Sequence, residues 1–363
     1  MQKPNYYIIL LLWYVCLISI YGQEDIQFKD LKLNEIQIIG SHNSYKIALQ
    51  KSLLYLVFQE DSTLAYSLQY NHLPITEQLN LGLRNLEIDL FHDPKGGRYS
   101  KPYGLKQITD GDVLKDSVER NQPGFKVFHI QDIDYCSHNI LFKNILEELK
   151  RWSEKNKNHI PVIITMNAKD QVINNPNFVT PLKFTKNTLD SIDLEIKSVL
   201  PKSKLITPDL IEGKFTTLEE AILKNGWPKI DSVRGRFLFV LDETGEKLNN
   251  YLNSDGSLTN KVLFVNAMEG NPNAAVRIIN DPIKNKDYIK ELVKKGYLVR
   301  TRADENTIEA RTNDYKRFIC AIESGAQIIS TDYYLPPKFF ESNYKIIFDN
   351  GHYIKISSLL GGK

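Results

Sequence analysis

Residues 161–166 read PVIITM, a short and almost continuous apolar run that is rich in β-branched residues. A run of this length and composition is typical of a strand that is buried on both faces of a parallel sheet. The sequence predicts eight such strands in all, because seven further runs of the same kind lie at residues 36–40 (IQIIG), 83–90 (LRNLEIDL), 125–130 (FKVFHI), 237–241 (FLFVL), 262–265 (VLFV), 298–302 (LVRTR) and 328–331 (IIST).

Helical patterns separate these runs. In residues 141–152 and again in 189–199, apolar residues recur at the spacing of one helix face. Strands that alternate with helices are typical of parallel βα units, and eight of them in about 300 residues fit a single-domain (β/α)8 TIM barrel of the α/β class. A doubly wound open sheet is the alternative fold, but no Gly-rich phosphate loop follows the first run, which disfavours it.

Both ends of the chain lie outside the expected barrel. Residues 1–22 combine a positively charged start, an apolar run and a final glycine, which is typical of a signal peptide. An uncleaved anchor is the alternative, although the run is shorter than the roughly 20 residues that a membrane span needs. In residues 341–363, YKIIF and YIKI flank Asp-Asn-Gly, a hairpin signal. We predict a signal peptide at 1–22, a barrel at 23–340 and a C-terminal β-hairpin extension at 341–363.

The composition limits the class of protein. A hydrophobic fraction of 42% excludes a disordered chain, and a net charge of +2 argues against nucleic-acid binding. Without residues 1–22 only Cys136 and Cys320 remain. Export permits a disulfide between them, but the sequence favours two free thiols. We therefore expect a secreted, soluble monomer without a membrane span after signal removal.

Polar side chains lie at the C-terminal ends of six of the eight runs. In a barrel these ends meet at one face, where the chemistry takes place. Buried polar groups cost free energy unless they are paired or hold a ligand, so the pattern predicts a charged site at that face. Its candidate residues are His42, Asn43, Glu87, Asp89, His129, Asn167, Lys169, Arg300, Arg302 and Asp332.

The residue types indicate the chemistry of this site. Asn43, Glu87 and Asp89 offer the hard oxygen ligands that Ca²⁺ prefers. His42 and His129 can serve as base and acid near neutral pH. The lysine and the two arginines can hold a phosphate. Together these groups favour cleavage of a phosphate ester. The alternative is an ion-pair network without metal, in which the acids pair with arginine or lysine and the arginines are neutralised by aspartates.

Four stretches carry a family resemblance. GSHNSY (40–45), GLRNLEIDL (82–90), VFHIQDID (127–134) and RTRADE with GAQIISTDYY (300–305 and 325–334) resemble the secreted calcium-dependent phosphatidylinositol-specific phospholipase C family, a group of phosphodiesterase barrels. The resemblance covers roughly residues 36–334. It implies cleavage of phosphatidylinositol-type lipids at a membrane surface to diacylglycerol and an inositol (cyclic) phosphate.

The resemblance also implies a role for each site residue. His42 would be the base that deprotonates the inositol 2-hydroxyl, and His129 would stabilise the phosphorane and protonate the leaving group. The family usually has a glutamate ligand where this chain has Asn167, so this position removes a negative charge from the calcium site. The implied sets are Asn43, Glu87, Asp89 and Asn167 for calcium, and Lys169, Arg300, Arg302 and Asp332 for substrate.

Two other functions remain possible on the sequence. One is a glycerophosphodiester or sphingomyelin phosphodiesterase on the same barrel, and the other is a non-catalytic lipid-binding barrel. Asn167 makes the non-catalytic alternative conceivable, while the presence of both histidines argues against it. Residues 53–58 (LLYLVF) either contact a membrane surface or, as we expect, form a core helix face.

Overall fold

The structure is a computed structural model that describes residues 28–108 and 116–361. The predicted signal peptide at residues 1–22 lies outside these ranges. Within them, none of the helices has both the length and the hydropathy to cross a bilayer.

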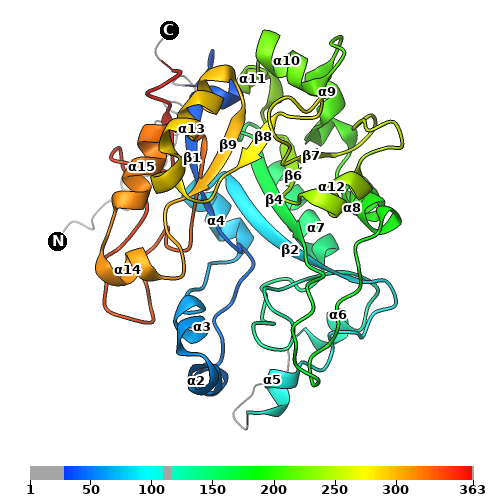
Figure 1. Ribbon diagram of the computed structural model, residues 1–363, viewed down its shortest axis with the longest axis vertical. Coiled ribbons are helices and arrows are strands. Elements are labelled where there is room, and N and C mark those ends of the chain that lie inside the picture. The colour runs from blue at the N-terminus through cyan, green and yellow to red at the C-terminus, as the bar shows by residue number, and fades with distance from the viewer. Residues whose placement is uncertain (1–27, 109–115, 362–363) are drawn as a thin grey trace, which may run out of the picture.

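Eight parallel strands form the centre of the molecule (Figure 1), as expected for the α/β class and the barrel architecture. Seven neighbouring pairs are joined by parallel ladders, in the order β8-β9-β10-β1-β2-β4-β6-β7. A single parallel bridge between Asn266 and Val276 joins β7 to β8. The strands are β1 (Ile36–Ser41), β2 (Asn85–Asp93), β4 (Val162–Ala168), β6 (Phe237–Leu241), β7 (Leu263–Val265), β8 (Val276–Ile278), β9 (Leu298–Arg302) and β10 (Ile328–Thr331).

One predicted barrel strand is wrong. The run at residues 125–130 forms β3 (Gly124–Val127), which pairs antiparallel with the far end of β2 and lies outside the parallel ring. Its apolar side chains are buried there, so the run has the composition of a core strand although its partner is different. The eighth barrel strand is β8, whose three residues include Arg277 and are too short and too polar to form a recognisable run. The two-residue β5 (Leu205–Ile206) pairs with the beginning of β6.

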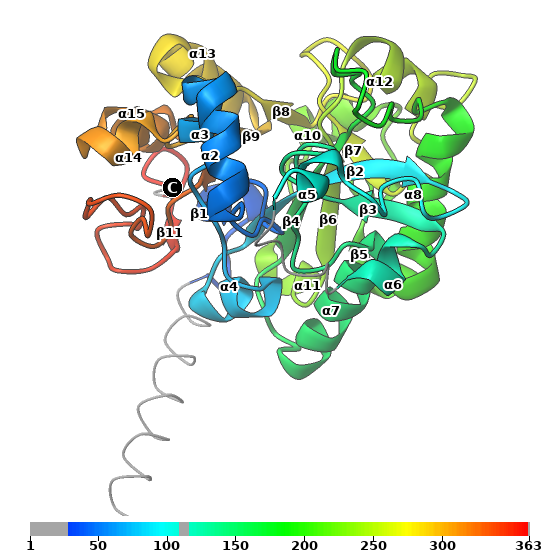
Figure 2. The same cartoon turned by 90° about the horizontal axis from the view of Figure 1, so that it is seen from below.

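Helices surround the sheet (Figure 2). The two predicted helix faces are confirmed in α7 (Phe142–Lys155) and α8 (Lys186–Val199), whose apolar stripes are buried against the strands. The other helices are α2 (Lys51–Glu60), α3 (Ser62–Ser67), α4 (Ile75–Leu81), α5 (Tyr103–Lys106), α6 (Ser117–Arg120), α9 (Pro208–Glu212), α10 (Leu218–Lys224), α11 (Ile230–Val233), α12 (Gly245–Tyr251), α13 (Pro282–Lys295), α14 (Ile308–Thr312) and α15 (Lys316–Ser324), with 3-10 turns at η1 (Leu33–Glu35) and η2 (Lys202–Lys204).

The C-terminal segment packs onto the barrel. Its turn is present, because the Gly351 N–H donates to the Phe348 carbonyl at 2.9 Å. The second arm forms β11 (Ile354–Ile356), which pairs antiparallel with residues 36–38 of β1. That edge is open because β1 meets β2 only at Gly40 and Asn85, where a Cβ on Gly40 would lie 2.4 Å from the Asn85 side chain. The segment therefore covers a strand edge that β2 leaves unpaired.

Helix α2 has one buried and one exposed face. Leu53 and Val57 are buried, whereas Tyr55 is 62% exposed and Phe58 38% exposed. Residues 53–58 thus contribute to a small core cluster, as expected, and also present apolar side chains to solvent. Figure 1 shows α2, α3, α5 and α6 together at the lower end of the molecule. Cys136 and Cys320 are free thiols, as the sequence favoured.

Candidate active site

A polar pocket of about 350 Å³ lies at the C-terminal ends of the barrel strands. Five acidic and four basic side chains line it. Of the ten residues predicted from the sequence, nine lie on its wall, and the tenth, Asp332, contacts His42 from behind. The barrel therefore brings together side chains from β1, β2, β4 and β9 and from the loop after β3.

His42 follows β1 and is held on both sides. Its backbone N–H donates to the Thr331 carbonyl at 3.0 Å, and its own carbonyl accepts from His72 Nε2 at 2.6 Å. Nδ1 lies 2.8 Å from Asp332 Oδ1 and 3.3 Å from Arg302 Nη2. Because Nδ1 cannot donate to one and accept from the other at once, the shorter distance assigns Nδ1–H as a donor to Asp332.

The environment of His42 keeps its imidazole neutral. Burial lowers the pKa of His42 well below its usual range, the Arg302 charge lowers it further, and the Glu87 carboxylate opposes both. Nε2 lies 3.5 Å from Glu87 Oε1, on the pocket side of the ring. A neutral imidazole with Nδ1–H bound to a carboxylate leaves Nε2 able to accept a proton.

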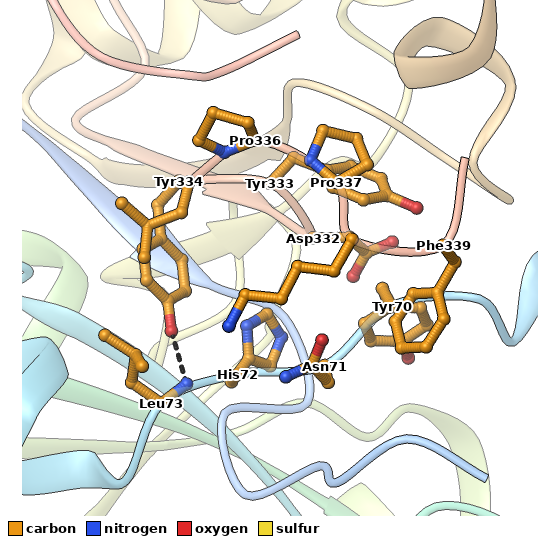
Figure 3. A pocket seen from close by; sticks show the side chains of 12 residues that line it. Tyr70, Asn71, His72, Leu73, Asp332, Tyr333, Tyr334, Pro336, Pro337 and Phe339 are labelled. Atoms are coloured by element: carbon orange, nitrogen blue, oxygen red, sulfur yellow. Dashed lines mark hydrogen bonds between the residues drawn. The ribbon is translucent and has the colours of Figure 1, made fainter. Parts of the chain in front are cut away.

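A second, smaller cavity lies behind Asp332, between residues 70–73 and 332–339 (Figure 3). Within it His72 stacks on Tyr334, with ring centroids 5.3 Å apart, and the Leu73 N–H donates to the Tyr334 hydroxyl at 2.9 Å. Burial lowers the pKa of His72 to about 4, so this ring is neutral. His72 thus supports the backbone of His42 and lies off the wall of the main pocket.

The two acids of β2 each pair with a cation. The buried Glu87 carboxylate accepts from Arg300 and lies 3.5 Å from the Asn167 amide nitrogen. Asp89 lies 3.3 Å from the Lys169 ammonium. The Asp89 charge raises the pKa of Lys169 against the opposing effect of burial, so this lysine stays protonated. Arg302 in turn donates to Asp332 at 3.2 Å.

His129 is part of the pocket although its strand prediction is wrong. It lies in the loop after β3, where its Nδ1 is 2.9 Å from Asp134 Oδ2. Asp134 also lies 2.9 Å from the buried Lys46 ammonium. The two histidines therefore come from different elements, and each has an aspartate at Nδ1.

Several residues of the site were not predicted from the sequence. The buried Tyr45 hydroxyl donates to Asn43 Oδ1 at 3.1 Å, while the Asn43 amide nitrogen donates to the Tyr70 hydroxyl at 2.7 Å. Two features of the sequence could have identified more of these residues. Tyr45 and Asp134 lie within quoted motifs, and Asp242 directly follows the apolar run at 237–241. The missed residues are Tyr45, Lys46, Tyr70, Asp134, Asp170, Asp242, Glu243, Lys247 and Asn280.

The chemistry of the pocket fits a calcium ion. Asn43, Glu87, Asp89 and Asn167 are all on its wall and offer only amide and carboxylate oxygens, the hard ligands that Ca²⁺ takes. Asp89 and Asn167 also lie at the same level on neighbouring strands, since they are register partners of β2 and β4. In residues 28–108 and 116–361, no three His, Cys, Asp or Glu side chains form a metal-binding group by themselves. Two carboxylates and two amides on the pocket wall are thus available to hold such an ion.

Comparisons with known proteins agree with this chemistry. The model of one family, described as phosphoinositide phospholipase C, Ca²⁺-dependent, matches residues 31–357. No curated protein sequence matches the chain.

Two solved structures show the same fold. One is the apo form of a calcium-dependent phosphoinositol-specific phospholipase C from Pseudomonas sp., with a TM-score of 0.55 and 16% identity over 92% of this chain and 97% of that one. The other is a Ca²⁺-dependent phosphatidylinositol-specific phospholipase C from Streptomyces antibioticus, with a TM-score of 0.51 and 15% identity over 85% of this chain and 96% of that one. At these identities the likeness concerns the fold.

Proposed function

The chain belongs to the family of Ca²⁺-dependent phosphoinositide phospholipases C, and from this premise we propose that it cleaves phosphatidylinositol-type phospholipids to diacylglycerol and an inositol phosphate. The observation that carries the proposal is the arrangement of His42. Its Nδ1 is bound to Asp332 at 2.8 Å, its Nε2 is on the pocket side, and the pocket also holds His129 and fixed cations.

In the proposed mechanism, His42 and His129 act as base and acid. His42 Nε2 takes the proton of the inositol 2-hydroxyl, whose oxygen then attacks phosphorus. The bond between phosphorus and the diacylglycerol oxygen breaks, and His129 donates a proton to that oxygen. Because nucleophile and phosphate belong to one molecule, most of the entropic cost of bringing them together is already met. The inositol product then carries a cyclic phosphate.

The remaining site residues bind the substrate and the metal. Lys169, Arg300 and Arg302 are proposed to hold the phosphate and the inositol hydroxyls, with Asp332 orienting both His42 and Arg302. Calcium would be held by Asn43, Glu87, Asp89 and Asn167, and when bound it would neutralise phosphate charge and lower the pKa of the 2-hydroxyl. Export after removal of residues 1–22, a barrel at 23–340 with the extension at 341–363, and a monomeric state remain proposals that rest on the sequence.

The proposal is tested by substrate choice. We expect purified residues 23–363, with calcium, to release diacylglycerol and an inositol phosphate from phosphatidylinositol vesicles. Hydrolysis should stop when a chelator removes the calcium. Phosphatidylcholine, sphingomyelin and glycerophosphodiesters are assayed in parallel. Turnover of one of these in place of phosphatidylinositol would assign the same pocket to another phosphodiesterase. Calcium binding without turnover of any substrate would favour the lipid-binding alternative.

We also propose that α2 contacts the lipid surface. Its buried residues Leu53 and Val57 belong to an apolar cluster against which Ile130 and Ile133 also pack, so the helix lies next to the loop that follows His129. On its other face Tyr55, Leu56 and Phe58 are exposed. Transfer of apolar side chains of a helix into the interfacial region of a membrane is favourable.

The double variant Tyr55→Ser and Phe58→Ser is therefore expected to bind phosphatidylinositol vesicles about 10-fold more weakly. Its hydrolysis of a soluble, short-chain substrate should stay within about 2-fold of the unmodified chain. Leu194→Ser is the matched control, because Leu194 is an exposed apolar residue of α8 at 66% exposure. An equal loss of vesicle binding in the control, measured by cosedimentation, would remove α2 from the proposal.

A further inference from the structure

We propose that Lys46 and Asp134, neither of which was predicted from the sequence, form a buried charge pair that positions His129 and sets which of its nitrogens carries the proton. The catalytic meaning of this pair rests on the proposed function. Its structural content, the proton arrangement of His129, can be tested without any turnover.

The geometry places Asp134 between two partners. Its carboxylate lies 2.9 Å from the Nδ1 of His129 and 2.9 Å from the Lys46 ammonium. The side chains of Lys46 and Asp134 are both completely buried, whereas that of His129 is 21% exposed and lines the pocket. The pair therefore reaches substrate only through the imidazole.

The backbone holds this arrangement in place. His129 and Asp134 belong to one tight loop, in which residues 130 and 134 form an antiparallel bridge. Asp132 lies between them with a positive φ of 68°, and its carboxylate accepts from the Tyr103 N–H at 2.7 Å and the Val179 N–H at 2.6 Å. On the other side, Lys46 forms an antiparallel bridge with Ser137. Both partners are therefore fixed relative to the imidazole.

The charges explain what the pair does. Burial acts to raise the pKa of Asp134, but the Lys46 charge and the His129 hydrogen bond outweigh it, and the net pKa is lowered. An ionised Asp134 can only accept, so His129 must donate from Nδ1, and its Nε2 is left for the substrate. Lys46 also lies 4.8 Å from the centre of the Tyr70 ring, which anchors the ammonium on a second side.

The lysine limits the effect of the aspartate. A lone buried carboxylate beside an imidazole would hold the second proton of the ring too firmly for an acid that has to release it. With Lys46 in place, its positive charge cancels the negative charge of Asp134 behind His129. Across the pocket His129 also interacts electrostatically with His42 and Asp332, which the variants below leave unchanged.

The test uses two variants that should move one titration in opposite directions. The full chain is labelled with ¹⁵N-histidine, and the His129 signals are those that disappear in His129→Gln. In the unmodified chain, neutral His129 should carry its proton on Nδ1. In Asp134→Asn, which leaves Lys46 uncompensated, the midpoint of the His129 titration should fall by about one pH unit or more. In Lys46→Met, which leaves Asp134 uncompensated, it should rise by a similar amount.

Three further variants separate positioning from stability. Lys46→Arg keeps the charge and should restore the original midpoint. The double variant Lys46→Met with Asp134→Asn buries no unpaired charge and should fold. The midpoint of its His129 titration should lie between those of the two single variants. Asp93→Asn breaks another buried pair, in which Asp93 lies 3.4 Å from the Lys126 ammonium off the pocket wall, and should leave the His129 titration unchanged. Midpoints that do not move, or that move in the same direction in both single variants, would overturn the proposal.

Kinetics then connect the pair to the reaction. If the unmodified chain hydrolyses phosphatidylinositol, Asp134→Asn should lower kcat by about 100-fold with KM within about 2-fold. The alkaline limb of the variant's pH–rate profile should shift together with the midpoint measured by NMR. If the unmodified chain has no activity, the proposed function fails while the NMR result still decides the role of the pair. A normal kcat in an Asp134→Asn variant whose histidine titration has shifted would also contradict the positioning role.

Discussion

Replacement of His42 by alanine is expected to lower kcat on phosphatidylinositol by about 1,000-fold. On the pocket wall, the bond between Nδ1 of this ring and Asp332 leaves Nε2 as the proton acceptor. Burial and the Arg302 charge lower the pKa of the ring and keep it neutral at the pH where a base is needed. The fold should survive, because Asp332 keeps its contact with Arg302 and water can occupy the space. Steady-state hydrolysis of vesicles and thermal unfolding, measured together, check both halves of this expectation.

His92→Ala is the matched control for this variant. His92 is a half-buried histidine on β2 that packs against Phe125 and Phe184 and is absent from the pocket wall. It should keep kcat within about 2-fold. If His42→Ala retained a tenth or more of the original rate, another group would have to be the base, and the proposed mechanism would have to be abandoned.

Replacement of Asp89 by asparagine is expected to weaken calcium binding by about 100-fold and to abolish hydrolysis at micromolar calcium. The change keeps the shape of the side chain but removes one of only two carboxylates in the proposed donor set. It also releases Lys169, whose ammonium lies 3.3 Å from Asp89 and would then add a positive charge beside the ion. Isothermal titration with calcium measures the affinity, and millimolar calcium should recover part of the hydrolysis.

Two further variants make this calcium prediction specific. Asn167→Glu adds a carboxylate at the level of Asp89 on the neighbouring strand, so it should raise calcium affinity by about 10-fold. Asp170→Asn changes an acid of the same wall that pairs with Lys247 at 3.2 Å, and calcium affinity should stay within about 2-fold. If Asn167→Glu weakened binding, or if Asp170→Asn matched Asp89→Asn, the ion would have to be placed elsewhere in the pocket.

The strands show how far a sequence pattern reaches. Seven of the eight apolar runs became barrel strands, because a strand that is buried on both faces must be apolar throughout. The run at 125–130 has the same composition and yet pairs antiparallel outside the ring. Composition records burial and says nothing of the direction of the partner strand. Conversely, β8 is held in the ring by its neighbours and needs only three residues, one of them an arginine.

The candidate site divides in a similar way. That polar residues from six runs would meet could be inferred from the sequence, because parallel strands of a barrel end at one face. The structure places nine of the ten around one pocket, including His129, whose strand was predicted wrongly.

What the sequence determined by itself is therefore the class of fold, the face that carries the site and the types of side chain available there, since these depend on local composition and on chain direction. Only the tertiary structure decided the partners of those side chains. Lys46 and Asp134 are 88 residues apart, and His42 and Asp332 are 290 apart. A pattern with a period of two or of 3.6 residues cannot carry information over such separations. The His42–Asp332 and Lys46–Asp134 contacts exist only once the barrel has brought these distant segments together.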